Sequence, residues 1–357
     1  MRKSHEQYFP QLDSLRAIAV LLVIISHWFA NEHFLNRYIA NGILGVTLFF
    51  VLSGFLITGI LLKSKTKLET GGSLGRAFKV FYVRRSLRIF PVYYLLLVVL
   101  FFFNIASIRE SFWWHFFYSS NFYFWIKDAF AGSLSHLWSL AVEEQFYLLW
   151  PALILLIPQR YFIKVLLAGV IIGSIFRLLF VTDVSDMARL LMPASLDSFC
   201  IGGLLAYGRT TELNWYKKYL QKQTIFIFFA FGLITLVHFP FFKQLPRALN
   251  SSLYFLFISV AFGILINRVS YSVNTPVIKH ILNNKVLLYI GKISYGVYLF
   301  HNFMPYFYGV KISFISPNLS LYAIQLFRFF ILITLASLSW HFIEKPFLSL
   351  KKRYEFS

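Results

Sequence analysis

The chain has 357 residues, of which 58% are hydrophobic and only 13% are charged, and its formal net charge is +20. Because about a quarter of the residues in a soluble globular domain are charged, this composition excludes a particle whose whole surface faces water. The single cysteine, Cys200, excludes an internal disulfide framework and a metal site built from cysteines.

Long apolar segments run through the whole chain. A helix that crosses a bilayer needs about 20 mostly apolar residues. The first apolar run lacks a small-residue cleavage site, so we interpret it as a membrane span and not as a signal peptide. In chain order, the sequence predicts spans at residues 12–30, 42–62, 89–105, 137–157, 161–181, 190–208, 224–240, 248–266, 286–305 and 321–343.

This pattern predicts an all-α polytopic membrane protein with about ten transmembrane helices, in a single membrane domain over residues 1–357 without an appended soluble domain. Of the 34 Lys and Arg residues, 24 lie in the predicted loops on one side and 7 in those on the other. Cytoplasmic loops carry the Lys and Arg excess, so both termini are expected in the cytoplasm. The basic charge is then mainly a topology signal, and nucleic acid is not an expected partner.

The predicted loop 63–88 holds eight positive charges, which is more than topology requires. Such a loop favours binding of anionic membrane lipid or of a phosphorylated ligand. Within it, Arg84, Arg85 and Arg88 cluster just before Pro91. These arginines are either topology anchors or a phosphate site.

Ionisable residues inside predicted spans indicate a functional site, because charges are costly in a bilayer. Seven such residues, from six predicted spans, fall at a similar depth in the outer half of the membrane. We therefore predict a polar cavity at this level, although the arginines and the aspartate among them are also typical of structural ion partners. The seven residues are His27, Glu143, Glu144, Arg177, Asp197, His301 and Arg328.

Arg16 and His27 are predicted to share one face of the first span. Their spacing of 11 residues corresponds to about three helical turns and about 16 Å along the axis. A cation at the cytoplasmic mouth suits phosphates, and an imidazole deeper in suits a general base. His27 alone would be typical of a structural histidine, and its pairing with an arginine on the same face favours function.

Other common catalytic patterns are missing from the sequence. It contains no Walker loop, no dinucleotide-binding glycine fingerprint, no nucleophile elbow and no histidine pair spaced for a metal. Nucleotide hydrolysis, serine hydrolysis and zinc chemistry are therefore unsupported, and no metal is expected.

A series of motifs resembles the acyltransferase 3 family of integral membrane acyltransferases nearly end to end. The first motif is the pair Arg16 and His27, separated by ten residues. The order and spacing of the motifs together are specific, whereas each alone is weak. The matching segments are 12–27, 49–57, 84–94, 136–147, 196–199 with Gly202, 293–301 and 343–347.

The resemblance implies about ten spans in a bacterial inner membrane and an acyl-CoA donor, by default acetyl-CoA, with no permanently bound cofactor. It implies a carbohydrate acceptor such as O-antigen, capsule, exopolysaccharide or peptidoglycan. It also implies that Arg16 and His27 are the essential pair and that the arginines at 84, 85 and 88 bind the donor. The predicted substrate cavity then comprises Asp197, Arg177, Arg328, His301 and Tyr295.

The resulting hypothesis is that acyl-CoA binds the arginines by its phosphates and places its thioester near His27, which removes a proton from a sugar hydroxyl. Glu143 or Glu144 would orient His27 or the acceptor, and an acyl-His27 intermediate is the less favoured variant. A transporter or flippase suits intramembrane charges equally well. A membrane glycosyltransferase is a third alternative, which usually needs a longer extracytoplasmic loop than 106–136.

Overall fold

The computed structural model of the protein describes residues 9–30, 33–38, 41–211, 244–271, 280–305 and 321–354. All regular structure in these ranges is helical. The α-helices are α1 (Pro10–Trp28), α2 (Phe34–Tyr38), α3 (Asn41–Glu69), α4 (Leu74–Phe103), α5 (Ile108–Phe116), α6 (Ser120–Lys127), α7 (Leu137–Leu156), α8 (Phe162–Phe180), α9 (Leu196–Thr210), α13 (Arg247–Tyr271), α15 (Lys285–Lys292), α16 (Ser294–Phe300), α18 (Leu321–Ser339) and α19 (Lys345–Ser349).

Short helical turns connect several of these helices. Most are 3₁₀ turns, and η7 is a turn of π-helix that joins α18 to α19. The turns are η1 (Ile105–Ser107), η2 (Gly132–Leu134), η3 (Gln159–Tyr161), η4 (Met187–Leu190), η5 (Met192–Ser195), η6 (His301–Phe303), η7 (Trp340–Glu344) and η8 (Leu350–Arg353).

Seven helical segments within the described ranges are long and apolar enough to cross a membrane. Each overlaps a predicted span, so seven of the predicted apolar helices are confirmed by length and composition, whereas the bounds differ most for 89–105, whose helix begins at Leu74. The predicted span 224–240 lies outside the described residues. The seven segments are Pro10–Trp28, Gly42–Glu69, Leu74–Phe103, Gly132–Leu156, Gln159–Phe180, Arg247–Ser270 and Leu321–Arg353.

Two predicted spans differ from the structure, so the prediction of ten is not confirmed. In the region 190–208, the 3₁₀ turn η5 contains a proline near its start. Only the 15 residues of α9 that follow are α-helical. At 1.5 Å per residue, α9 is about 22 Å long, which is shorter than the hydrocarbon core of a bilayer. The region 286–305 is broken at Ile293 into α15 and α16.

The expected loop 63–88 is also wrong, because these residues are largely helical. Helix α3 continues to Glu69 and α4 begins at Leu74. Ser73 caps α4, since its hydroxyl accepts a hydrogen bond of 3.4 Å from the backbone N–H of Arg76. Lys and Arg are good helix formers and reach water along their alkyl stems, so both helices extend past their apolar parts.

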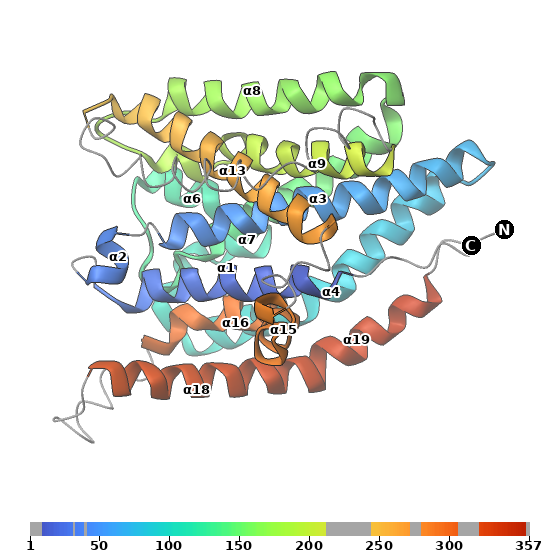
Figure 1. Ribbon diagram of the computed structural model, residues 1–357. Helices are drawn as coiled ribbons and strands as arrows, with labels where there is room; N and C mark the ends of the chain where they lie inside the picture. The colour runs from blue at the N-terminus through green and yellow to red at the C-terminus, as the bar shows by residue number, and fades with distance from the viewer. Residues whose placement is uncertain are drawn as a thin grey trace.

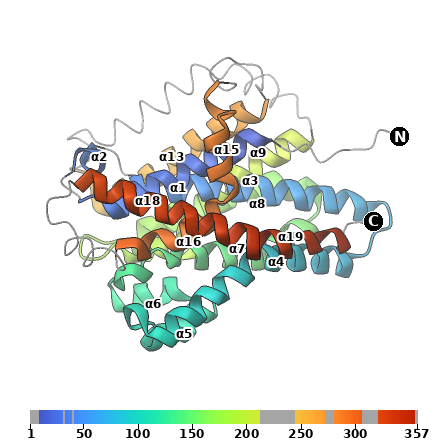
Figure 2. The same ribbon diagram turned by 90° about the horizontal axis from the view of Figure 1, so that it is seen from below.

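The bundle has buried central helices and exposed outer ones. Inside the protein, 61% of the apolar window of α1 is buried, against 17% for the last span, which contains α18. Helix α8 lies at one side of the bundle and α18 at the other (Figure 1). The short aromatic helices α5 and α6 project from the flank of the bundle (Figure 2).

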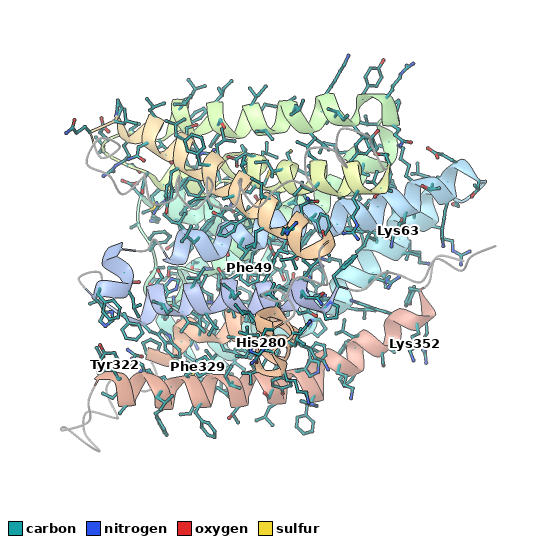
Figure 3. All side chains as sticks on the ribbon, in the orientation of Figure 1. Phe49, Lys63, His280, Tyr322, Phe329 and Lys352 are labelled. Carbon is teal, nitrogen blue, oxygen red and sulfur yellow. The ribbon has the colours of Figure 1, made fainter. Side chains whose placement is uncertain are left out.

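The two ends of the bundle differ in charge. Lys63 and Lys352 extend toward the end at which α1 begins and α19 ends, whereas Tyr322 lies at the opposite end (Figure 3). We call the first end the basic end. The α3–α4 turn, Thr70–Ser73, lies there too.

Helices α3 and α9 approach each other closely because each carries a glycine at the contact. A Cβ atom on Gly54 would lie 2.1 Å from the carbonyl oxygen of Phe199, and one on Gly202 would lie 2.2 Å from that of Val51. Small residues allow such close packing of helices in membranes. The contact brings α9 against the centre of the bundle.

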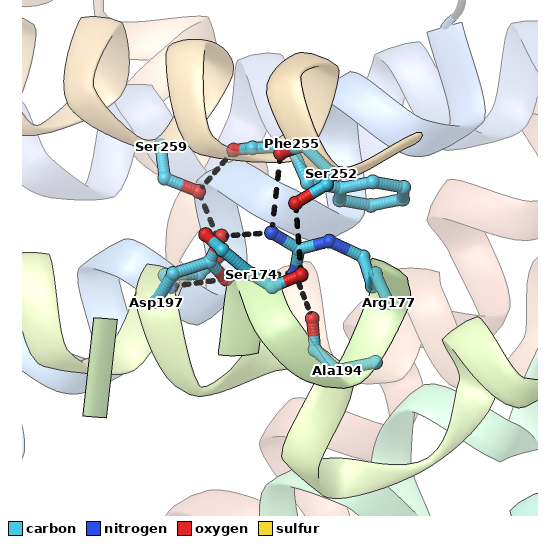
Figure 4. Close-up of polar contacts among 8 residues, drawn as sticks. Ser174, Arg177, Ala194, Asp197, Ser252, Phe255 and Ser259 are labelled. Atoms are coloured by element: carbon cyan, nitrogen blue, oxygen red, sulfur yellow. Dashed lines mark hydrogen bonds and ion pairs between the residues drawn. The ribbon is translucent and has the colours of Figure 1, made fainter. Parts of the chain in front are cut away.

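A buried ion pair joins α8, α9 and α13. Arg177 and Asp197 have no exposed surface, and their side chains meet at 2.5 Å (Figure 4). Arg177 also donates to the carbonyl oxygens of Ala194 and Ser252, and its guanidinium lies 5.2 Å from the centre of the Phe255 ring. The two charges neutralise each other within the protein, although the Nε atom of Arg177 has no hydrogen-bond partner in the described ranges, and we call this pair a structural clamp.

Candidate active site

His27 occupies the last turn of α1, away from the basic end. Its imidazole is exposed, although it touches a fully buried histidine. The Nδ1 atom lies 3.0 Å from the carbonyl oxygen of Val23 and 3.1 Å from Nε2 of His301. The other ring nitrogen, Nε2, has no hydrogen-bond partner among the described residues. A nitrogen that is accessible and unpartnered is available to a substrate.

His301 lies at the start of η6, and its side chain is fully buried. Its ring centre is 4.9 Å from that of His27 and 4.9 Å from that of His136. The indole N–H of Trp28 donates to the backbone oxygen of His301 at 2.9 Å. The end of α1 and the turn η6 are therefore held together on the Nδ1 side of the His27 ring.

Arg16 lies three turns earlier on the same unbroken helix, as predicted. It pairs with Asp13 one turn away, and its side chain is 20% exposed. Arg88 of α4 lies within electrostatic range of Arg16 and of Arg85. Three guanidinium groups from two helices thus gather in the basic half of the bundle, where they suit an anionic group.

Arg85 is anchored by an aromatic ring and keeps an unused donor. Its guanidinium carbon lies 3.7 Å from the centre of the Tyr147 ring, which is the stacked geometry of a cation–π contact. Its Nε atom is buried and has no hydrogen-bond partner in the described part of the chain. A buried donor without a partner is costly; the Nε atoms of Arg177 and Arg328 share this property, so the position of Arg85 beside Arg88 is what favours an anionic ligand here.

Glu143 and Glu144 occupy different surroundings, as their adjacent positions predict. Glu143 accepts hydrogen bonds from Ser53 at 2.9 Å and from Tyr147 at 3.1 Å. Glu143, Ser53 and Tyr147 therefore form one hydrogen-bond network, which contacts Arg85 through the Tyr147 ring. Glu143 has no contact with His27 among the described residues. Glu144 is partly exposed, has no hydrogen bond in the described ranges and lies within electrostatic range of Arg85.

Tyrosines surround Glu144. Tyr93, Tyr94, Tyr118 and Tyr295 all lie within its electrostatic range. The hydroxyl of Tyr295 donates to the carbonyl oxygen of Ile89 at 2.8 Å, whereas the buried hydroxyl of Tyr118 has no hydrogen-bond partner in the described ranges. Aromatic faces beside one carboxylate are a suitable wall for a sugar or an acyl chain.

The structure separates three predicted cavity residues from this site. Arg177 and Asp197 form the structural clamp described above, which has no accessible surface. Arg328 donates to the side-chain oxygen of Gln325 at 3.2 Å and balances no carboxylate among the described residues. Gln325 in turn donates to the backbone oxygen of Trp28 at 2.7 Å. A role of these three residues toward a substrate stays a prediction.

Two residues were not singled out from the sequence. Glu344 ends the π-helical turn η7, is only 3% exposed and lies within electrostatic range of Arg88. Turns of π-helix occur often at functional sites. Lys351 of η8 lies within electrostatic range of Arg84, Arg85 and Arg88. The motif 343–347 was the one sequence signal near them.

His115 shows what a structural histidine looks like in this chain. It lies in α5, outside the membrane-spanning segments, with its Nδ1 atom 2.9 Å from the carbonyl oxygen of Ser111. Burial lowers the pKa of this imidazole from 6.5 to about 4, so it remains neutral at physiological pH. It has no contact with His27 or Arg16 among the described residues, although it lies within electrostatic range of His136 and its backbone oxygen accepts from Tyr93.

These surroundings define a multi-span helical protein with a cation cluster and an accessible imidazole on one central helix. A model of an acyltransferase domain matches residues 9–343. The chain therefore belongs to this acyltransferase family. No solved structure shows a significant match to the chain.

Three relatives extend this result. The chain is 29% identical to "Peptidoglycan O-acetyltransferase OatA" of Listeria monocytogenes, over 95% of its own length and 56% of the relative. It is 32% identical to "Putative peptidoglycan O-acetyltransferase YrhL" of Bacillus subtilis, over 97% and 56%. It is 32% identical to a "Putative O-acetyltransferase" of Staphylococcus aureus, over 96% and 57%. The chain spans little more than half the length of these relatives.

Proposed function

We propose that the protein is a membrane O-acyltransferase that moves an acyl group, by default acetyl, from cytoplasmic acyl-CoA to a carbohydrate hydroxyl across the membrane. The observation that carries this proposal is helix α1, which joins the cation cluster to the accessible His27. The two residues, Arg16 and His27, are about 16 Å apart along the helix axis. That separation is of the order of the pantetheine arm of CoA.

The residues suit a direct transfer. Arg16, Arg85 and Arg88 bind the phosphates of the donor, and the thioester lies beside His27. His27 Nε2 takes the proton of the acceptor hydroxyl while the oxygen attacks the thioester carbonyl. A C–O bond forms, the C–S bond breaks, and the departing thiolate of CoA takes the proton from His27.

The relatives support the choice of acceptor and acyl group. Two of them carry printed names that include peptidoglycan, and all three are named as O-acetyltransferases. We therefore propose an envelope carbohydrate as the acceptor, with peptidoglycan first and O-antigen, capsule or exopolysaccharide as the other candidates. The Lys and Arg excess supports a location in the cytoplasmic membrane of a bacterium, with the basic end in the cytoplasm.

The test measures CoA release by the purified protein from acetyl-CoA, with and without a peptidoglycan disaccharide. A thiol reagent can report the product, because the chain has one cysteine, Cys200, and it is buried. We expect His27→Ala to abolish acceptor-dependent release. His341→Ala is the matched control, since His341 is also exposed and bonded through Nδ1 to a carbonyl oxygen one turn earlier, at 2.8 Å.

Two results would overturn the proposal. One is a folded His27→Ala protein that still releases CoA in an acceptor-dependent manner. The other is counterflow of a labelled lipid-linked glycan in liposomes without any CoA release, which would identify a transporter or flippase. Mass spectrometry of the acetylated disaccharide would name the hydroxyl that is modified.

A further inference from the structure

We infer that His301 is a positioning residue: it holds His27 in the tautomer that carries hydrogen on Nδ1, so that Nε2 faces the substrate as the basic atom. This inference rests on the proposed function, because it assigns a partner to the proposed base. It is carried by the contact between His301 Nε2 and His27 Nδ1 at 3.1 Å.

The partners of His301 determine which of its nitrogens carries hydrogen. Its Nδ1 atom lies 2.6 Å from the carbonyl oxygen of Tyr298. A carbonyl oxygen only accepts hydrogen bonds, so Nδ1 must be the donor. A neutral imidazole has one N–H group, and a fully buried one is costly to charge. His301 therefore presents the lone pair of Nε2 toward His27.

The tautomer of His27 follows from the same reasoning. Its Nδ1 atom faces two acceptors, the carbonyl oxygen of Val23 at 3.0 Å and Nε2 of His301. Only an N–H group on Nδ1 satisfies both. The neutral ring then has its lone pair on Nε2, the nitrogen without a partner in the described part of the chain. The Val23 carbonyl and His301 thus act together, and His301 is the side chain that holds the ring in the orientation that leaves Nε2 open.

The surroundings of His301 keep it rigid enough for this role. Its ring is packed edge-on against His136, and its backbone oxygen accepts from Trp28. The next residue, Asn302, donates to the carbonyl oxygen of Ser133 at 3.1 Å. A second residue that fixes the tautomer and orientation of a base is effective only when its own rotamer is held.

The contact also has a consequence during the reaction. When His27 Nε2 takes a proton, its Nδ1–H continues to donate to His301 and stabilises the imidazolium. Transfer of the Nδ1 proton to His301 is unfavourable, because a charge on that fully buried ring is costly. The charge therefore stays on His27, and the departing thiolate takes the Nε2 proton.

Two amide variants separate this role from a structural one. In His301→Gln, the side-chain amide reaches the position of Nε2 and can accept from His27. In His301→Asn, the shorter amide reaches only the position of Nδ1, which keeps the bond to Tyr298 and loses His27. We expect His301→Asn to lower kcat about 10- to 100-fold, the range found when the residue that orients a functional histidine is lost, and His301→Gln to retain most activity.

The pH–rate profile is a second readout. We expect the acidic inflection of kcat/KM to move to lower pH in His301→Asn, because the imidazolium of His27 loses one of its two acceptors and keeps only the Val23 carbonyl oxygen. The inflection should stay in place in His301→Gln, and the KM for acetyl-CoA should be unchanged in both variants. His341→Ala, which removes an exposed imidazole bonded to the Ser337 carbonyl oxygen, should keep the wild-type kcat and profile.

The inference is overturned if His301→Asn keeps the wild-type kcat and pH profile, or if His301→Gln is as defective as His301→Asn. His27→Ala is measured in the same assay. If His27→Ala is inactive while His301→Asn behaves as wild type, only the role of His301 is rejected. If His27→Ala is active, the proposed function itself is rejected.

Discussion

Two groups of charged side chains in this bundle look alike in the sequence and differ in the structure. Arg177 and Asp197 face each other with no exposed surface and with backbone acceptors close by. Arg16 and Arg88 lie near each other and both are partly exposed, with Asp13, Glu143 and Glu344 in the same surroundings. The first group is a closed pair, whereas the second has capacity left for an anion.

The comparison shows that exposure and charge balance separate structural charges from functional ones. A buried pair is stable because each member neutralises the other, and removal of one member is costly. Arginines that gather at an accessible place in a membrane protein are candidates for a binding site, and donor binding by them is the proposal made above. Four substitutions probe this difference, in order of decreasing expected effect.

The largest effect is expected when the closed pair is broken. Arg177→Leu leaves the carboxylate of Asp197 buried and unpaired, which should cost about 3–5 kcal/mol of stability. The double variant Arg177→Leu/Asp197→Leu should recover most of that loss. Thermal unfolding in detergent measures both. A double variant as unstable as the single one would contradict the structural role of the pair.

In the cation cluster we expect a smaller effect, which changes the KM for the donor and not the stability of the protein. Arg88→Gln should raise the KM for acetyl-CoA about 10- to 100-fold, the equivalent of about 1.5–3 kcal/mol for a bond to a charged group, with little change in Tm. Arg109→Gln is the control, since Arg109 is bound to the carbonyl oxygens of Phe101 and Phe102 on the exposed end of α4. Equal KM values for the two variants would argue against donor binding by Arg88.

The hydrogen-bond network of Glu143, Ser53 and Tyr147 should contribute less to the use of acetyl-CoA than Arg88 does. Ser53→Ala removes one donor to Glu143 but leaves Tyr147 in place. A net loss of about 1 kcal/mol predicts a severalfold lower kcat/KM for acetyl-CoA. Ser64→Ala on the same helix, which removes a bond to the Ile60 carbonyl oxygen, is the matched control. Wild-type kinetics for Ser53→Ala would remove Glu143 from the donor site.

The smallest effect is expected at the edge of the cluster. Lys351→Gln should raise the KM for acetyl-CoA a fewfold at low salt, and the difference should disappear near 1 M salt, where the Debye length is about 3 Å. Lys352→Gln, the more exposed neighbour, should have a smaller effect. A salt-independent change would indicate that Lys351 acts by packing.

Local patterns predicted much of the fold. Seven of the predicted spans are helices of sufficient length, because a bilayer requires long apolar helices whatever their neighbours are. The periodicity of an α-helix also put Arg16 and His27 on one face of α1. The expected loop at 63–88 was wrong because basic residues favour helix as much as they mark topology.

The candidate site was only partly predictable. The sequence predicts the apolar segments that contain His27 and His301. The contact between these two residues, however, joins positions 274 apart in the chain. No local sequence pattern predicts that contact. None predicts the approach of Lys351 to the arginines of α4 either. The placement of Arg177 and Asp197 in a closed pair also depends on how α8, α9 and α13 pack.

The sequence by itself determined that this protein is a helical membrane protein of an acyltransferase family, and it determined which residues carry charge into the membrane. Hydrophobicity, helical periodicity and ordered motifs are local properties, which one chain reveals directly. The tertiary structure decided which charges neutralise each other, which nitrogen of His27 stays open and which distant residues join the cations. These depend on distances between helices, and such distances arise only when the bundle is packed.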